Sequence, residues 1–175
     1  MRKETDLSRE RLAHLVKDVM RMFERALQMR LALHEVSIGH WPFLRVLWAA
    51  DGLTQRELSE EAGVMEPTTF AALKAMERRG YIVRRPVPGD RRKRQVFLTA
   101  RGRSLEAKLV PLAKDVNAIA ARGVPGADVA ATRRTLLALY ANLVADEADG
   151  GNERRVPSTR ELGRLARIAA RVRLE

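Results

Sequence analysis

The sequence predicts a mainly α-helical protein that carries one small β-hairpin. Leu and Ala recur along the 175 residues, while aromatic residues account for only 5% of them, which favours helices over a β-sandwich or a barrel. Two short helical patterns stand on either side of Gly63. Two short runs of strand-forming residues flank a turn-rich, basic segment at 86–94, which is typical of a hairpin.

The N-terminal region is predicted to form two helices. Apolar residues recur at three- and four-residue spacing over 7–32, which indicates one long amphipathic helix. After a break at 35–39, a compact apolar helix covers 40–50, with Pro42 in its first turn, where proline is tolerated. Gly52 follows its end, since glycine readily takes the left-handed conformation there.

Two further helices and a turn come next. Thr54 begins the first as an N-cap, and Glu57 completes a capping box three residues later. This helix stops at Gly63, and a second helix covers 66–79 with Pro67 in its first turn. Two short helices separated by a glycine-containing turn are the helix-turn-helix pattern.

The hairpin and two more helices complete the ordered part of the prediction. Strands are expected at 81–85 and 95–98, joined by a turn at 86–90 and a basic loop. Thr99 then begins a long helix, and a further helix ends near residue 146. The class predicted is therefore mainly α with a small β-hairpin, a helix-turn-helix followed by a wing.

The charge balance points to an anionic partner. The formal net charge is +11 and the isoelectric point is near 11.0, so nucleic acid and an anionic membrane surface are both candidates. Residues 78–103 hold ten basic side chains and one acid, Asp90, which gives this segment a charge of +9. The ten are Arg78, Arg79, Arg84, Arg85, Arg91, Arg92, Lys93, Arg94, Arg101 and Arg103.

Several function classes are disfavoured by what the sequence lacks. There is no cysteine, which excludes disulfides and thiolate chemistry. No nucleophile–base arrangement, phosphate-binding glycine loop or HExxH signature is present, so an enzyme is not expected, nor is a cofactor or a metal. A zinc site from His34, Glu35 and His40 is the least favoured alternative. The charged N-terminus and the absence of a long apolar run predict a cytoplasmic protein without a membrane anchor.

Short motifs over residues 53–102 occur in the order and spacing of one regulator family. They are Leu53-Thr54-Gln55-Arg56-Glu57-Leu58, Gly63-Val64, Pro67-Thr68, Gly80-Tyr81-Ile82, Asp90-Arg91-Arg92, Leu98-Thr99 and Gly102. With the order of the predicted elements, they resemble the multiple-antibiotic-resistance regulator (MarR) family of winged helix-turn-helix transcriptional regulators. The detailed match covers about residues 40–105, and the helical layout extends it to about 146.

The resemblance implies that double-stranded DNA is the partner. It places the helix from Glu66 in the major groove and the basic hairpin on phosphates or in the minor groove, where arginine is favoured. Asp90 would brace the hairpin through Arg92. The implied DNA-contacting residues are Thr54, Gln55, Glu66, Pro67, Thr68, Thr69, Arg84, Asp90, Arg91, Arg92, Lys93 and Arg94.

Some of these residues have an alternative, purely structural interpretation. Thr68 and Thr69 would then stabilise the start of their helix, and a few arginines would pair with Glu77 or other acids. The family usually has a serine, a basic residue and an arginine where this sequence has Met65, Glu66 and Ala71. Residues Phe70, Leu73 and Met76 are spaced for the core.

A symmetric dimer is expected, because two-fold DNA-binding proteins need a symmetric interface. The resemblance places a helical dimerisation region at 7–32 and 105–146, and the winged helix-turn-helix domain at 40–104. The apolar stripes of the long helices could instead complete a monomer core. Residues 147–175 are a linker and a basic C-terminal helix, whose pattern fits dimer contact, DNA contact or an anionic surface. Added dimer contact with some phosphate attraction is the hypothesis.

The resemblance also implies a small aromatic acid effector. Trp41, Arg45 and Trp48 share a helix face, so the arginine could hold a carboxylate between aromatic rings, with His34 and His40 donating nearby. The alternative is that the tryptophans belong to the core and the histidines are capping or exposed. The function expected is a dimeric repressor of a pseudo-palindromic operator that such an acid releases. A nonspecific architectural DNA-binding protein without a ligand is the alternative.

Overall fold

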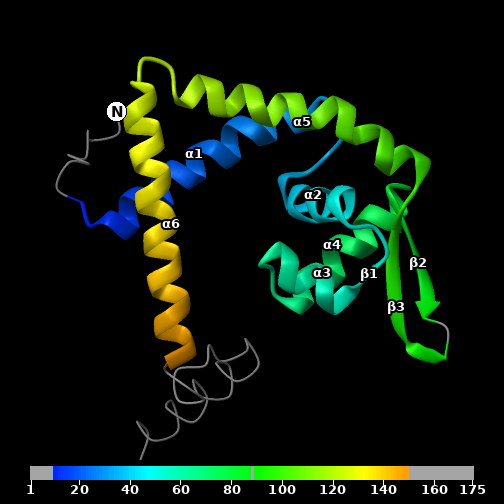
Figure 1. The fold of residues 1–175 in the computed structure, drawn as a ribbon. Helices are drawn as coiled ribbons and strands as arrows, with labels where there is room; N and C mark the ends of the chain where they lie inside the picture. The colour runs from blue at the N-terminus through cyan, green and yellow to red at the C-terminus, as the bar shows by residue number, and fades with distance from the viewer. Residues whose placement is uncertain (1–9, 88, 150–175) are drawn as a thin grey trace, which may run out of the picture. The chain divides into compact units, whose positions relative to one another are not determined.

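The computed structural model describes residues 10–87 and 89–149, with the side chains of 90–92 and 147–149 outside the description. The chain is mostly helical and has one small antiparallel sheet, as predicted (Figure 1). The elements in order are α1 (Leu12–Ala32), a 3-10 turn (Ile38–His40), α2 (Trp41–Ala49), β1 (Leu53–Thr54), α3 (Gln55–Ala62), α4 (Glu66–Arg78), β2 (Ile82–Val87), β3 (Asp90–Leu98), α5 (Ala100–Ala120) and α6 (Gly126–Asp149).

The chain divides into two compact units, residues 1–122 and 123–175. The first unit holds α1 to α5 and the sheet, and the described part of the second unit is α6. The predicted C-terminal basic helix and the linker from residue 150 lie outside the described residues, as do residues 7–9 of the first predicted helix.

The sheet has three antiparallel strands in the order β1-β3-β2. Val96 of β3 pairs with Leu53 on one side and with Arg84 on the other. The predicted hairpin is therefore confirmed, although both strands are longer than the sequence indicated, and an irregularity falls between Pro86 and Val87. Strand β1 was not predicted, because two residues are too few to show a strand alternation.

Local capping signals are satisfied as predicted. The Thr54 hydroxyl accepts from the backbone N–H of Glu57 at 3.3 Å, and the Glu57 carboxylate accepts from the Thr54 backbone N–H at 2.7 Å. Gly63 ends α3 with φ 62°, a left-handed conformation suited to glycine. The Thr99 hydroxyl caps α5 by accepting from the N–H of Gly102 at 3.0 Å.

One core joins α2, α3, α4 and the sheet, and α1 and α5 extend it. Each large side chain fully buried there contributes about 1.5–3 kcal/mol of transfer free energy. The side chains buried at 1% exposure or less include Leu31, Phe43, Leu44, Leu47, Leu58, Leu73, Met76, Tyr81, Ile82, Val96 and Leu109. Leu73 and Met76 confirm the core prediction for α4, but the prediction for Phe70 is wrong, because 50% of its surface is exposed.

A turn at Glu35 ties the end of α1 to the end of α4. The Glu35 carbonyl oxygen accepts from Tyr81 Oη at 3.1 Å and from Arg79 Nη1 at 3.0 Å. Its carboxylate accepts from Arg101 Nη2 at 3.0 Å, which adds the first turn of α5. These bonds fix the orientation of α4 relative to the long helices of the same unit.

Candidate nucleic-acid interface

The turn between α3 and α4 fixes how α4 is rotated. The Thr69 side chain is fully buried, and its hydroxyl donates to the carbonyl oxygens of Met65 at 3.2 Å and Val64 at 3.3 Å. The Ser59 hydroxyl donates to the same Val64 carbonyl. The structure therefore corrects the expectation that Thr69 contacts DNA: its only polar side-chain atom is used inside the protein, at the start of α4.

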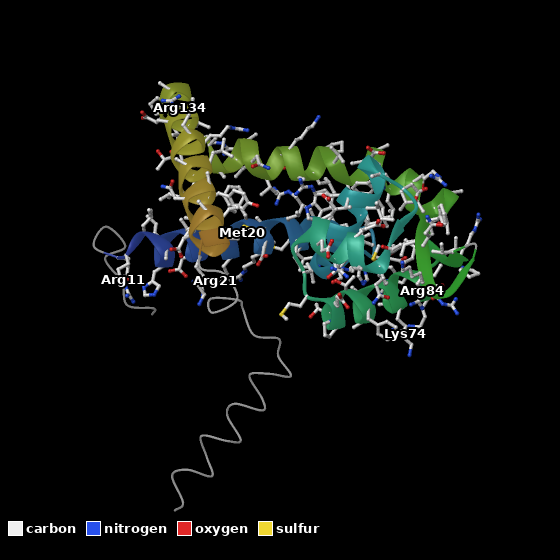
Figure 2. All side chains as sticks on the ribbon, turned by 60° about the horizontal axis from the view of Figure 1, so that its bottom comes forward. Arg11, Met20, Arg21, Lys74, Arg84 and Arg134 are labelled. Atoms are coloured by element: carbon white, nitrogen blue, oxygen red, sulfur yellow. The ribbon has the colours of Figure 1, made fainter. Side chains whose placement is uncertain are left out.

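Because Thr69, Leu73 and Met76 face the core, the opposite side of α4 faces outward. Its exposed residues are Glu66, Pro67, Thr68, Phe70, Ala71, Lys74 and Arg78. The first turns of this face are thus mostly apolar and its last turns are basic. Figure 2 labels Lys74 on this helix. Lys74 was missed as an interface candidate, although its spacing from Ala71 and Arg78 already put the three residues on one face.

Arg84 forms an ion pair with Glu77. Its Nε and Nη2 atoms donate to Oε2 of Glu77 at 3.0 Å and 2.6 Å, and its side chain is only 16% exposed. These hydrogen bonds lower the pKa of the Glu77 carboxyl. The Arg84 guanidinium also lies over the Phe70 ring, 5.8 Å from its centroid. Arg84 is therefore paired with Glu77 within the protein, and its contact with DNA stays a prediction.

The wing, residues 82–98, presents exposed cations on β3. Lys93 and Arg94 are both exposed. Asp90, Arg91 and Arg92 lie on β3, but their side chains are outside the described residues, so the predicted Asp90–Arg92 brace stays a prediction. Arg85 lies over the Phe97 ring at 5.1 Å.

Acids from other parts of the chain neutralise some of the basic side chains of the 78–103 segment. Arg84 pairs with Glu77 and Arg101 pairs with Glu35 at 3.0 Å. Arg103 pairs with Asp51 at 2.7 Å. All three acids lie outside the segment, so the ten-to-one count could not reveal them. At least three of the ten basic side chains are therefore paired with acids within the protein.

A groove of about 730 Å³ lies between the starts of α3 and α4 and the wing. Its lining includes Thr54 and Gln55, so the structure brings these predicted residues together with Glu66, Lys93 and Arg94. The Thr54 hydroxyl is used in the α3 capping box. The full lining is Thr54, Gln55, Arg56, Glu57, Glu60, Glu66, Phe70, Arg84, Lys93 and Arg94.

The five predicted ligand-binding residues do not form one site. Trp41 and Trp48 contact each other edge to face at 5.8 Å, and Trp48 Nε1 donates to the Gly102 carbonyl oxygen at 3.0 Å. Arg45 is exposed and lines a separate groove of about 430 Å³ without either tryptophan. The prediction that Arg45 lies between the two indole rings is therefore wrong. The tryptophans pack against each other and contribute to the structure instead.

The two histidines also differ in environment. His40 is buried edge-on against Tyr81, and burial, helped by the charge of Arg79, lowers its pKa. Its Nδ1 atom has no hydrogen-bond partner among the described residues. His34 lies partly buried in the turn after α1. Over residues 10–87 and 89–149 there is no cluster of three potential metal ligands, and no helix is long and apolar enough to cross a membrane.

Comparison with known proteins gives one family match, related regulators and solved structures of the same fold. Residues 34–93 match the model described as the MarR family. The regulator TtmR of Methylorubrum extorquens (strain PA1) is 33% identical over 87 residues, which are 50% of this chain and 45% of TtmR. A MarR transcriptional regulator from Methanosarcina mazei Go1 superposes with a TM-score of 0.71 at 23% identity, over 77% of this chain and 96% of that one. BpsR of Bordetella bronchiseptica superposes with a TM-score of 0.69 at 20% identity, over 75% of this chain and 99% of BpsR.

The helix-turn-helix of α3 and α4, followed by the β2–β3 wing, defines a winged helix-turn-helix protein. Over residues 34–93 the chain is similar to the MarR family, and its fold is shared by a solved MarR transcriptional regulator. The matched relative TtmR is an HTH-type transcriptional regulator. The chain spans less than half the length of TtmR, and the two solved structures share its fold.

Proposed function

We propose that this chain is a dimeric DNA-binding repressor that occupies a pseudo-palindromic operator and is released by a small aromatic acid. The observation that carries the DNA-binding part is the groove between α4 and the wing. It sets the exposed face of α4 beside the exposed cations Lys93 and Arg94. A helix flanked by a cationic hairpin matches a major groove flanked by phosphates.

The distribution of charge supports separate regions for backbone contacts and base contacts within this surface. Glu57, Glu60 and Glu66 lie on α3 and α4 and line the same groove as the wing cations. A phosphate is therefore repelled from the helix side of the groove and attracted to the wing. The wing and the end of α4, through Lys74 and Arg78, would bind the backbone. The start of α4 would then face base edges, where a carboxylate can accept from cytosine N4.

The apolar surface of the long helices supports a second copy of this chain as the partner. On α6, Leu136, Tyr140 and Leu143 share one face, and Tyr140 and Leu143 are 69% and 70% exposed. On α1, Val16, Val19 and Met20 are exposed as well. Exposed apolar surface of this kind marks interaction sites, and a symmetric dimer would place two copies of α4 on successive major grooves.

The ligand part of the proposal rests on the fold neighbours and on one arginine. The DNA binding of BpsR is described as regulated by 6-hydroxynicotinic acid. In this chain, exposed Arg45 borders a groove that is also lined by Pro42, Val46, Ala49 and Leu53. A guanidinium beside an apolar wall suits an aromatic carboxylate.

A selection experiment tests the DNA-binding function. Duplexes would be enriched from a random pool, and the best would be footprinted and compared with random duplex at 150 mM salt. We expect an imperfect palindrome with half-sites about one helical turn apart and an affinity on the order of 10³-fold or more above random duplex. Equal affinity for random duplex would favour the architectural protein instead.

A second assay tests the release. Aromatic acids would be screened by thermal shift, and the hits would be added to the footprinted complex. We expect the active acids to raise Tm and to dissociate the duplex, and an Arg45→Ala variant to lose both effects. Hits that raise Tm without releasing the DNA would contradict the repressor mechanism.

A further inference from the structure

Phe70 is a large apolar side chain on the exposed face of α4, the face proposed to enter the major groove. Burial of Thr69 fixes the rotation of the helix and turns the next residue outward, so Phe70 keeps 50% of its surface exposed. Pro67 and Ala71 lie beside it on the same exposed side. The exposed first turns of α4 thus carry three apolar residues and no basic one, whereas a phosphate-binding surface would be basic.

The ring is held in place by two further residues. The Arg84 guanidinium lies over the Phe70 ring at 5.8 Å. Arg84 is itself fixed by two hydrogen bonds to one oxygen of Glu77, at 3.0 Å and 2.6 Å. Arg84 thus covers one face of the ring, which limits the rotation of the side chain and leaves the ring edge on the groove.

On the side of the groove, the ring is surrounded by polar side chains. Among the described residues that line the groove between α4 and the wing, Phe70 alone carries an apolar side chain. Thr54, Gln55 and Glu66 present oxygen and nitrogen atoms around it, and Lys93 and Arg94 add charge from the wing. A partner that fills this groove must offer one apolar group among many polar ones.

The major groove of DNA offers one such group, the C5-methyl of thymine. We propose that Phe70 is a specificity-determining residue that selects thymine by contact with this methyl group, and that Glu77 and Arg84 position its ring. This inference rests on the proposed DNA-binding function. It assigns the selection of one base to an apolar contact rather than to a side-chain hydrogen bond.

Replacing thymine by deoxyuridine in the best selected duplex, one base at a time, tests the inference. This replacement removes the methyl group and keeps every hydrogen-bonding atom of the base. At one symmetry-related pair of thymines we expect affinity to fall about fourfold per half-site. This factor corresponds to the transfer free energy of one buried carbon. The full-length Phe70→Ala variant should bind the thymine and deoxyuridine duplexes with equal affinity, a non-additivity that a double-mutant cycle measures.

Two variants separate base selection from general weakening. Lys74→Ala lies on the same helix and removes a charge, so it should weaken all duplexes equally and keep the loss caused by deoxyuridine. Phe70→Leu retains an apolar group and should retain part of that loss. Because Phe70 is half exposed, both Phe70 variants should unfold at nearly the wild-type Tm.

The outcomes distinguish this inference from the proposed function. If one duplex is preferred but no thymine is sensitive to loss of its methyl group, the assignment of Phe70 is overturned and the repressor function stands. Equal sensitivity in wild type and Phe70→Ala overturns it in the same way. If no duplex is preferred over random sequence, the proposed function itself fails.

Discussion

Glu35 has a backbone φ of 62°, in the left-handed region that residues other than glycine rarely adopt. Its carbonyl oxygen and its carboxylate are both hydrogen-bonded, to Arg79, Tyr81 and Arg101. Such strain persists only where the surroundings determine it. Here the strained residue joins three elements, the ends of α1 and α4 and the start of α5.

Gly102 is required by a close approach of two backbones. A Cβ at this position would collide with the backbone carbonyl oxygen of Tyr81, which cannot move without disturbing β2. We expect Gly102→Ala to lower the free energy of unfolding by about 1–3 kcal/mol, the usual cost of overpacking, as measured by denaturant unfolding. Gly126→Ala is the matched control, because a Cβ there meets open space. Equal stability of the two variants would contradict the close approach.

His40 predicts how stability depends on pH. Its pKa is lowered in the folded state by burial and by Arg79, so the unfolded state takes up a proton first as the pH falls below about 6.5. The contribution of neutral His40 is therefore complete above that pH and is lost as the pH falls toward the folded pKa. We expect the free energy of unfolding to decrease from pH 7.5 to pH 5.5.

Two measurements assign this pH dependence to His40. The chain has three histidines, so the His40 ring signal can be resolved by NMR, and it should titrate below the ordinary histidine value of about 6.5. His40→Gln should reduce the pH dependence of stability. A His40 ring that titrates at or above the ordinary value would refute the prediction.

At the scale of elements, the proposed function assigns backbone affinity to the wing and selectivity to α4. Removing the exposed cations Lys93 and Arg94 together takes four charges from a dimer. If all four bind phosphates, the slope of log affinity against log salt should fall by about 3.6, at roughly 0.9 per phosphate. Fluorescence anisotropy between 50 and 200 mM salt measures this slope. The affinities for selected and random duplex should fall by similar factors.

The matched control removes two cations that belong to helices and not to the wing. Lys114 lies on α5 and Arg134 on α6, where Figure 2 labels it. The Lys114→Ala/Arg134→Ala variant loses the same charge as the wing variant. It should change the slope much less, because a local phosphate contact is lost only in the wing. Equal losses in both variants would indicate that net charge, rather than the wing, drives binding.

The elements themselves were largely predicted by local signals. The Thr54 capping box, the left-handed Gly63 and the Thr99 cap all depend on residues within four positions of one another, so they could be found in the sequence. The two-residue β1 could not, since it exists only through its pairing with Val96. The roles of Thr69 and Arg84 depended on the rotation of α4, which no local pattern determines.

At the scale of the whole molecule, the proposal requires a second copy of the chain. Tyr140 and Leu143 share the exposed face of α6, so charges placed there would disrupt a dimer without entering the described core. We expect Tyr140→Glu/Leu143→Glu to be monomeric at micromolar concentration by light scattering. Its affinity for the selected palindrome should fall, because the two half-sites would then bind independently.

Asn142→Glu provides the control, because Asn142 lies on the opposite side of α6 from that apolar face. This variant should keep the wild-type mass and the wild-type DNA affinity. A Tyr140→Glu/Leu143→Glu protein that keeps the dimer mass would remove α6 from the proposed interface.

The sequence alone determined the order of the helices, the caps, the hairpin and the location of the basic segment. These depend on hydrophobic period, turn chemistry and composition, all of which act over a few residues. The tertiary structure decided which arginines are neutralised, as in the pairs Arg101–Glu35 and Arg103–Asp51, whose members lie 66 and 52 residues apart. It also turned Phe70 outward, since burying Thr69 beside Leu73 and Met76 leaves Phe70 on the exposed side of α4. Charge pairing and helix rotation are set by packing between distant segments.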